Sequence, residues 1–373
     1  MRHERTGIMK SLQWSLPATL ALFVAGVAIA EAPADSGAGD VLKAPRDGRI
    51  GYVLTERRWA VYSEDDLDKT CPNGFNSGPR DQFDRLFPMD NGQQYTELET
   101  RLMREGRQAH PSTSEDPFPF YEAQGHISYG LNLDGEIGPD DLQSPTGEKG
   151  IDNQVYRAVG CIDGYRYKGA VWQFDTDDML ANLSNRFVIE LTGVDDFRND
   201  DDVTVTTYRG LDGLHRDATG ALSAGGIQRI DLRWGQPFIY RLQGRIVDGV
   251  LTTEPVDDFK LLWSMGNKMG GHQLFQGFRM QIELSPGSAE GLFAGYVDID
   301  RWDHNLNTNW TTHFQAYGHV SQPSLYRAMS RLADGYPDPV TGKNTAVSSA
   351  VEVSFVQVHV LHPPEDARVA RTE

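Results

Sequence analysis

Alternation of apolar and polar residues, the period of a β-strand, constrains the fold of this chain more than any other feature. It runs from about residue 171 onward. In RFVIEL the apolar residues Phe187, Ile189 and Leu191 share one face, and DVTVTTY and RIDLRW alternate in the same way. Successive side chains of a strand point to opposite faces, so each segment has one face to bury. We therefore expect a series of half-buried strands.

Turn signals between these segments predict that neighbouring strands are antiparallel. Asp248-Gly249 separates two β-prone runs in RLQGRIVDGVLTTEP, and Ser285-Pro286-Gly287 does the same in the next pair. Both are typical of hairpins. In the last segment, AVEVSFVQVHVL, the apolar phase shifts near Phe355, which indicates a bulge or burial on both faces. The predicted fold is mainly β, an antiparallel β-sandwich or open barrel over residues 171–373 with a few short helices.

Two segments have the spacing of a helix. In QQYTELETRLMREG the apolar residues share one helical face, and Gly106 can terminate the helix. In SQPSLYRAMSRLADG we expect Ser321 to be the N-cap and Gly335 to follow the end. The rest of residues 50–170 is rich in Gly, Pro, Asn and Asp and is predicted to be loop-rich, and residues 31–49 are predicted to be a flexible leader.

The first 30 residues resemble a secretory signal peptide. Arg2, Arg5 and Lys10 precede the apolar run LPATLALFVAGVAIA, which ends in the small-x-small pattern of Ala28 and Ala30. The alternative is a retained N-terminal anchor. The rest of the chain has no apolar run of the ~18 residues that a spanning helix needs. We predict a periplasmic or secreted protein with no membrane span in the mature chain.

Charge excludes some classes of partner. The 373-residue chain has a net charge of −18 and is 39% hydrophobic, as in soluble globular proteins. Its acidic field repels nucleic acid and anionic membranes and favours cations. No P-loop or GxGxxG motif indicates a nucleotide, and no GxSxG or HExxH motif indicates a hydrolase of those classes.

The chain has two cysteines, Cys71 and Cys161. In an exported protein they are predicted to form a disulfide, which ties residues 50–170 together. The bridge would close a loop of about 90 residues and contribute up to about 4 kcal/mol. Neither cysteine lies in a CxxCH or CxxC motif, so the sequence predicts no haem.

The segment GLNLDGEIGPDD resembles an EF-hand calcium loop. With Gly135 at the sixth position, oxygen-bearing side chains fall where the loop needs ligands, but Gly130 leaves the first position empty. Calcium held with help from a later segment is one interpretation, and an Asx-rich turn without a metal is the other. The candidate ligands are Asn132, Asp134, Glu136, Asp141, Asp152 and Asn153.

A second acidic cluster, Asp195 to Asp202, allows three interpretations: a solvated hairpin tip, a second calcium site, or a carboxylate pair for glycoside hydrolysis. The segment RWDHNLNTNWTTHFQAYGHV concentrates aromatic and histidine residues. As a strand over residues 311–320, it would line a groove for a polar ligand such as a carbohydrate, unless the tryptophans only pack. The candidate ligand-binding residues are Trp302, His304, Trp310, His313, Tyr317 and His319.

The motifs GIDNQ, RIVDGVLTTEP and RLADGYPDP resemble a family of exported bacterial proteins. The resemblance covers most of the chain after Cys71. It implies export from a bacterial cell and assigns no catalytic residue. Two functions remain open: an exported β-rich binding or accessory protein, stabilised by its disulfide and by calcium if the loop binds it, or a secreted hydrolase of a polysaccharide or ester that uses carboxylates and a histidine.

Overall fold

The computed structural model describes residues 44–62, 67–96, 99, 103–115, 118–181, 183–232, 238–264, 271–307 and 318–363. The predicted signal peptide and most of the leader lie outside these residues. Leu42–Glu373 form one compact unit, so the predicted boundary at residue 170 falls inside a single unit. Strands hold 38% of the residues and helices 21%, which confirms a mainly β fold.

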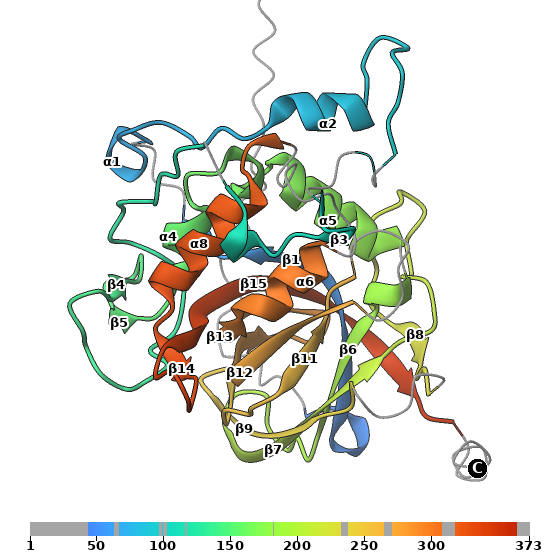
Figure 1. Cartoon of the computed structure of the whole chain (residues 1–373). Helices are drawn as coiled ribbons and strands as arrows, with labels where there is room; N and C mark the ends of the chain where they lie inside the picture. The colour runs from blue at the N-terminus through green and yellow to red at the C-terminus, as the bar shows by residue number, and fades with distance from the viewer. Residues whose placement is uncertain are drawn as a thin grey trace, which may run out of the picture. The chain divides into compact units, whose positions relative to one another are not determined.

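The architecture is an antiparallel barrel (Figure 1). Eight of the described strands pair in sequence order, and the last returns to pair with the first. The ring closes because the first strand pairs with the last, so its alternating residues have a closed interior to face. The ring consists of β1 (Arg49–Trp59), β6 (Phe187–Thr192), β7 (Asp200–Arg209), β9 (Arg241–Val247), β10 (Val250–Thr253), β12 (His272–Leu284), β13 (Ser288–Asp298) and β15 (Asn344–Leu361).

Short strands and helices surround this ring. In the same sheet, β8 (Gly226–Arg229) and β14 (Gly335–Pro337) pair with β15, and β11 (Phe259–Leu262) pairs with β12. The other short elements are β2 (Met103–Arg104), β3 (Arg107–Gln108), β4 (Leu142–Gln143), β5 (Lys149–Ile151), η1 (Arg46–Gly48), η2 (Pro111–Thr113), η3 (Asp163–Tyr165) and η4 (Leu183–Asn185).

The helices gather on one side of the barrel, where α5 packs on β1 and α6 packs on β12 (Figure 1). They are α1 (Leu67–Thr70), α2 (Arg80–Leu86), α4 (Gln154–Val159), α5 (Ala170–Ala181), α6 (Ile299–Asn307) and α8 (Gln322–Leu332). As predicted, the side chain of Ser321 caps α8 by accepting a hydrogen bond from the backbone N–H of Ser324. Among the described residues, no helix combines the length and apolar character needed to cross a membrane.

The hairpin and disulfide predictions are confirmed. Asp248 and Gly249 adopt positive φ angles of 49° and 87° in the turn between β9 and β10, as the tightest hairpin turns require. Ser285 to Gly287 connect β12 and β13. Cys71 and Cys161 form a disulfide with their Cα atoms 5.7 Å apart.

The strand expected at RIDLRW is misplaced: it lies earlier, at β8, and ends at Arg229. The helix expected to end at Gly106 does not reach that residue, because Glu105 and Gly106 form a hairpin turn with positive φ angles. Glu99 is helical, and residues 97, 98 and 100–102 lie outside the described residues. As expected, Gly335 follows the end of α8, and it begins β14.

Candidate functional site

The interior of the barrel is filled with side chains and leaves no ligand site there among the described residues. An eight-stranded barrel is just wide enough for its own side chains or for one small ligand. Here six phenylalanines from facing strands contact one another, and the rings of Phe259 and Phe278 stack with centroids 3.8 Å apart. The six are Phe187, Phe259, Phe275, Phe278, Phe293 and Phe355. A ligand must therefore bind outside.

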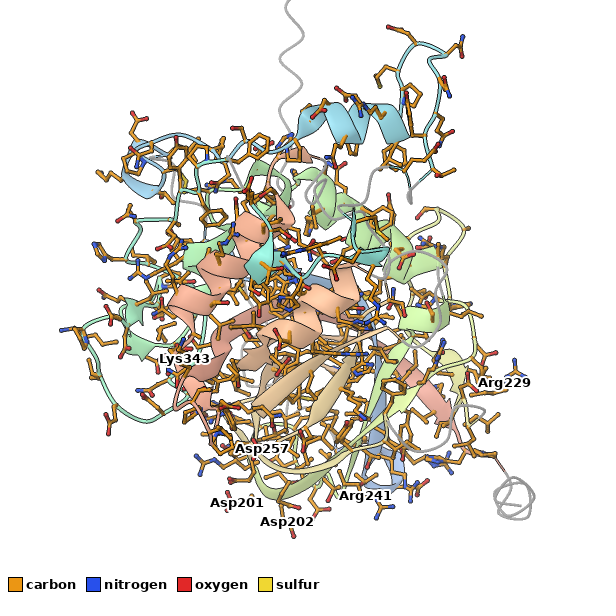
Figure 2. The ribbon with its side chains drawn as sticks, viewed as in Figure 1. Asp201, Asp202, Arg229, Arg241, Asp257 and Lys343 are labelled. Atoms are coloured by element: carbon orange, nitrogen blue, oxygen red, sulfur yellow. A yellow bond between two sulfur atoms is a disulfide. The ribbon has the colours of Figure 1, made fainter. Side chains whose placement is uncertain are left out.

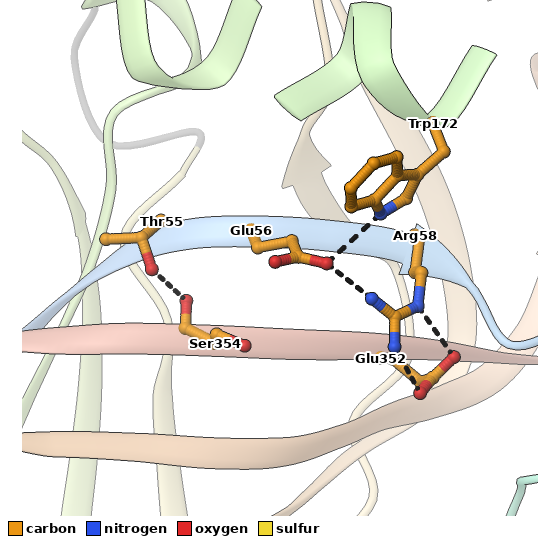
Figure 3. Close-up of polar contacts among 6 residues, drawn as sticks. All are labelled: Thr55, Glu56, Arg58, Trp172, Glu352 and Ser354. Atoms are coloured by element: carbon orange, nitrogen blue, oxygen red, sulfur yellow. Dashed lines mark hydrogen bonds and ion pairs between the residues drawn. The ribbon is translucent and has the colours of Figure 1, made fainter. Parts of the chain in front are cut away.

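A bulge in β1 decides which of its charged residues face outward. The pairing with β15 slips at Thr55, so Leu54 lies opposite Phe355 while Glu56 lies opposite Ser354. At this bulge the Thr55 hydroxyl donates a hydrogen bond of 2.9 Å to the Ser354 carbonyl (Figure 3). One extra residue reverses the side-chain alternation that follows it. As a result Glu56 and Arg58 point outward, whereas Arg57 points inward and is fully buried.

The outer wall carries a groove of about 430 Å³ across β10, β12, β13, β15 and β1. Its floor is two rows of side chains, because antiparallel pairing aligns residues of four neighbouring strands. One row runs Glu283, Glu290, Ser354, Glu56, and the other runs Gln281, Leu292, Glu352, Arg58. Four carboxylates therefore share the groove with one guanidinium. Tyr129, Val250, Gly291 and Val353 complete the lining.

Arg58 is tied to two of the four glutamates (Figure 3). Its Nε and Nη2 atoms donate to the two carboxylate oxygens of Glu352 at 3.0 and 2.9 Å, a bidentate pair, and Nη1 pairs with Glu56. Burial by itself lowers the pKa of Arg58, but the hydrogen bonds and charges of Glu352 and Glu56 outweigh it and raise the pKa. This side of the groove is a closed ion-pair network.

Aromatic side chains hold the network from above. The indole N–H of Trp172, on α5, donates to the Glu56 carboxylate at 3.1 Å. The ring of Tyr167 lies 5.0 Å from the Arg58 guanidinium and 5.2 Å from the Trp172 ring. At the rim, burial and then the charge of Glu352 raise the pKa of Tyr129.

On the other side of the groove, at β12 and β13, no cationic side chain among the described residues pairs with the carboxylates. Glu283 and Glu290 lie directly opposite each other on β12 and β13, and both are exposed. Among the described residues neither carboxylate has an ion-pair partner. Like charges in this position destabilise a sheet, so folding alone gives no reason for the pair. The two carboxylates are available to a cation.

The predicted calcium loop is a network of Asx turns. Side-chain oxygens of Asn132, Asp134 and Asp141 accept hydrogen bonds from the backbone N–H groups of Gly135, Glu136 and Gly138, and Asn132 donates to the Glu136 carbonyl. Within the part of the chain that the structure describes, no three His, Cys, Asp or Glu side chains converge to hold a metal ion. Calcium stays a prediction.

The two later candidates of that set have structural partners. Asp152 accepts a hydrogen bond from the Leu133 N–H, and burial raises its pKa to about 6, helped by the charges of Asp134 and Asp141. Asn153 is fully buried, caps α4 and donates to the carbonyl of Ala60. Asp152 therefore ties the loop to the segment before α4, and Asn153 ties that segment to the residue after β1.

The predicted ligand-binding segment does not reach the groove where it is described. Residues 299–307 form α6, and Trp302 is only 3% exposed because it stacks on Trp59 at 4.6 Å. This packing agrees with the alternative that the tryptophans only pack, and a ligand-binding role of Trp302 stays a prediction. His304 is exposed on α6, and His319 contacts Arg80 at 2.9 Å. Trp310, His313 and Tyr317 lie outside the described residues.

The acidic cluster of residues 195–202 lies elsewhere, and Asp201 and Asp202 mark its place on β7 (Figure 2). Its carboxylates are used within the turn: Asp200 accepts from the N–H groups of Asp195 and Asp202. Asn199 accepts from the Asp248 N–H in the neighbouring hairpin. These contacts agree with a solvated hairpin tip.

The sequence did not single out the groove residues. No family model, curated protein or solved structure matches the chain, so the resemblance to exported bacterial proteins stays a prediction. One signal was present in the sequence: MQIELSPGSAEG places charged residues at strand positions on both sides of a hairpin turn. Which of these charged residues meet in space depends on the closure of the barrel and on the bulge at Thr55.

Proposed function

We propose that this protein is a binding protein whose groove takes an organic ligand that carries a positive charge. The observation that carries the proposal is the pair Glu283 and Glu290, two exposed carboxylates opposite each other with no ion-pair partner among the described residues. A cation placed between them would relieve their repulsion and gain two charge-assisted hydrogen bonds. A carbohydrate ligand would use this charge if it carried an amino group.

The setting of the pair supports a binding role. The groove of about 430 Å³ has the size of a small-molecule site. Its floor consists of paired strands of a closed barrel, so the carboxylates are held on rigid elements before the ligand arrives. The net charge of −18 adds a long-range field that attracts cations.

Titration with n-heptylamine at pH 8 tests the proposal. We expect binding that weakens with added salt and falls at least about tenfold in Glu283→Gln and in Glu290→Gln, because each loses one charged contact. Glu254→Gln is the matched control, since Glu254 is exposed and does not line the groove. Equal affinities of all four proteins, or no binding by the wild type, would overturn the proposal.

Hydrolysis of a glycosidic bond is the second candidate, favoured by the same pair. Residues opposite each other on antiparallel strands have Cα atoms about 5 Å apart, so their side chains can bring two carboxyl groups to the separation of about 5–5.5 Å that retaining glycosidases need. Such enzymes also need one carboxyl kept protonated by burial, and both glutamates are exposed. Release of reducing sugar from a polysaccharide panel, abolished in Glu290→Gln, would establish this activity; no release by the wild type would remove it.

We also propose that the protein acts outside the cytoplasm. The Cys71–Cys161 disulfide supports this, because disulfides persist in oxidising compartments. N-terminal sequencing of the exported protein should find a start after Ala30. The predicted calcium site has its own test: a chelator should lower the melting temperature if calcium binds the folded chain, and identical melting curves would reject it.

A further inference from the structure

We propose that Arg58 sets the specificity of the groove: it permanently occupies one of two cation positions, so that a second positive charge on a ligand gains no affinity. This inference rests on the proposed function. Its starting point is Arg58, a cation of the chain itself, which lies among the carboxylates of the groove.

The surroundings of Arg58 show what a filled cation position looks like in this groove. The guanidinium receives two carboxylate oxygens from Glu352 and a third from Glu56, and the face of Tyr167 lies 5.0 Å away. Two carboxylates and an aromatic face are the contacts by which proteins recognise ligand cations. The chain supplies its own cation here.

Glu283 and Glu290 form the second position, which has two carboxylates and no cation from the described chain. In the row Glu283, Glu290, Ser354, Glu56 the residues belong to neighbouring strands about 4.8 Å apart. The midpoint of the first pair and the place of the guanidinium, between β15 and β1, are then about two strand spacings apart, or about 10 Å. An extended seven-carbon diamine spans about that distance.

Arg58 is held strongly enough to stay in place when a ligand arrives. Its pairing with Glu352 is bidentate, which fixes the plane of the guanidinium. Trp172 fixes Glu56 by donating to its carboxylate, so both anionic partners of Arg58 have defined positions. A free ammonium would have to break all these contacts to take its place.

The consequence is that the groove uses only one positive charge of a ligand. The first ammonium of a ligand neutralises part of the charge of Glu283 and Glu290. A second ammonium about 10 Å away would meet Arg58 and gain nothing from Glu56 and Glu352, which are already paired. The wild-type groove therefore does not distinguish a monoamine from a diamine of the same length, whereas a groove without Arg58 would favour the diamine.

The experiment compares n-heptylamine with the seven-carbon diamine that has an amino group at each end, by calorimetric titration at pH 8 and constant ionic strength. We expect the wild type to bind the two within about threefold of each other. Arg58→Gln should bind the diamine at least about tenfold more tightly than the wild type does, and the monoamine within about threefold. Arg58→Lys keeps the charge but loses the bidentate pair, so its gain of affinity for the diamine should be smaller than that of Arg58→Gln.

Gain of affinity is a result that loss of structure cannot produce. No gain for the diamine in Arg58→Gln, or an equal gain for both amines, would overturn the inference. Should Arg58→Gln fail to fold, as judged by near-UV circular dichroism, the wild type decides: a preference of tenfold or more for the diamine overturns the inference. Failure of the wild type to bind either amine refutes the proposed function itself, which separates the two failures.

Discussion

Arg57 and Arg58 are neighbours in the sequence, yet they lie on opposite faces of the wall formed by β1 and β15. Arg58 faces the groove, is tied to two glutamates, and has a raised pKa. Arg57 faces the interior, where burial lowers its pKa to about 10 against the opposing charges of Asp175 and Asp178. The charged form of arginine is thus stabilised on the outer face, at Arg58, and destabilised on the inner face, at Arg57.

The inner face satisfies its polar groups incompletely. Arg57 donates to the Leu262 carbonyl and lies 4.3 Å from the Trp263 ring centre, but two of its nitrogens, Nε and Nη2, have no hydrogen-bond partner among the described residues. Asp175 accepts from the Trp263 indole at 3.2 Å with one oxygen, and the other oxygen has no partner there. Burial raises the pKa of Asp175 to about 6, although Arg57 lowers it.

A charged side chain lowers the stability of the fold on one face of this wall and can bind a ligand on the other. On the inner face water is excluded, so an incompletely paired charge is penalised by desolvation. On the outer face water screens the unpaired glutamates, so the penalty is small and their charge remains available to a ligand. Buried charge therefore costs stability in the interior, whereas the charge in the groove is available to the ligand that we propose.

Insertion of one alanine between Glu56 and Arg57 should destabilise the protein strongly. The added residue reverses the side-chain alternation after Glu56, so Arg58 would turn inward and Arg57 and Trp59 outward. Breaking the ion pairs of Arg58, separating Arg57 from Asp175 and exposing a tryptophan should cost about 5 kcal/mol or more, enough to unfold a typical domain. Circular dichroism and urea denaturation measure the loss.

The conservative control is Thr55→Ser, which keeps the bulge and the hydroxyl that bonds to the Ser354 carbonyl. It should cost no more than about 1 kcal/mol. An insertion variant as stable as the wild type would show that the alternation after Glu56 does not fix which residues face the groove.

The same bulge explains how far the sequence could predict the fold. Alternation identified most of the later strands, and the phase shift near Phe355 corresponds to burial on both faces of β15, with the extra residue in its partner β1. β1 itself was missed because TERRW does not alternate: Arg57 occupies an inward position that the pattern reserves for apolar residues. Closure of the barrel depended on that strand.

The candidate site was less accessible to prediction for a related reason. Short segments rich in Asp, Asn, Trp and His predict binding sites because their residues are close in sequence. The groove joins residues near positions 56, 283, 290 and 352, and only the register of four strands brings them together. Local turn chemistry explains most of the Asx-rich segments without a ligand.

Asp175→Asn tests the cost of the buried charge on the inner face. A folded-state pKa of about 6, raised from 3.8, means that the folded protein binds this proton more tightly than the unfolded chain does. The group therefore costs nothing below about pH 4, costs progressively more between pH 4 and 6, and costs its full amount above pH 6. Asparagine mimics the neutral form, so the variant should be more stable by about 2–3 kcal/mol at pH 8.

Urea denaturation of both proteins at pH 8 and at pH 4 measures this effect. The difference between them should largely disappear at pH 4, where the wild-type carboxyl is protonated. Asp177→Asn, at an exposed position on the same helix, should change stability by less than about 0.5 kcal/mol at either pH. A destabilised Asp175→Asn at pH 8 would mean that attraction to Arg57 outweighs the cost of burial.

Glu290→Gln tests the outer face, where we expect only a small change in the free energy of unfolding. Removing one of two like charges that face each other across β12 and β13 should stabilise the fold by about 0.5 kcal/mol at low salt, and the gain should vanish near 1 M salt because the groove is open to water. Glu254→Gln, which has no carboxylate opposite it, should show no gain. The variant that loses affinity for n-heptylamine would then be the more stable protein, as expected for charges kept for binding. A loss of stability at low salt would instead mean that Glu290 makes a favourable contact in the fold, and the pair would no longer be the free anionic position on which the groove depends.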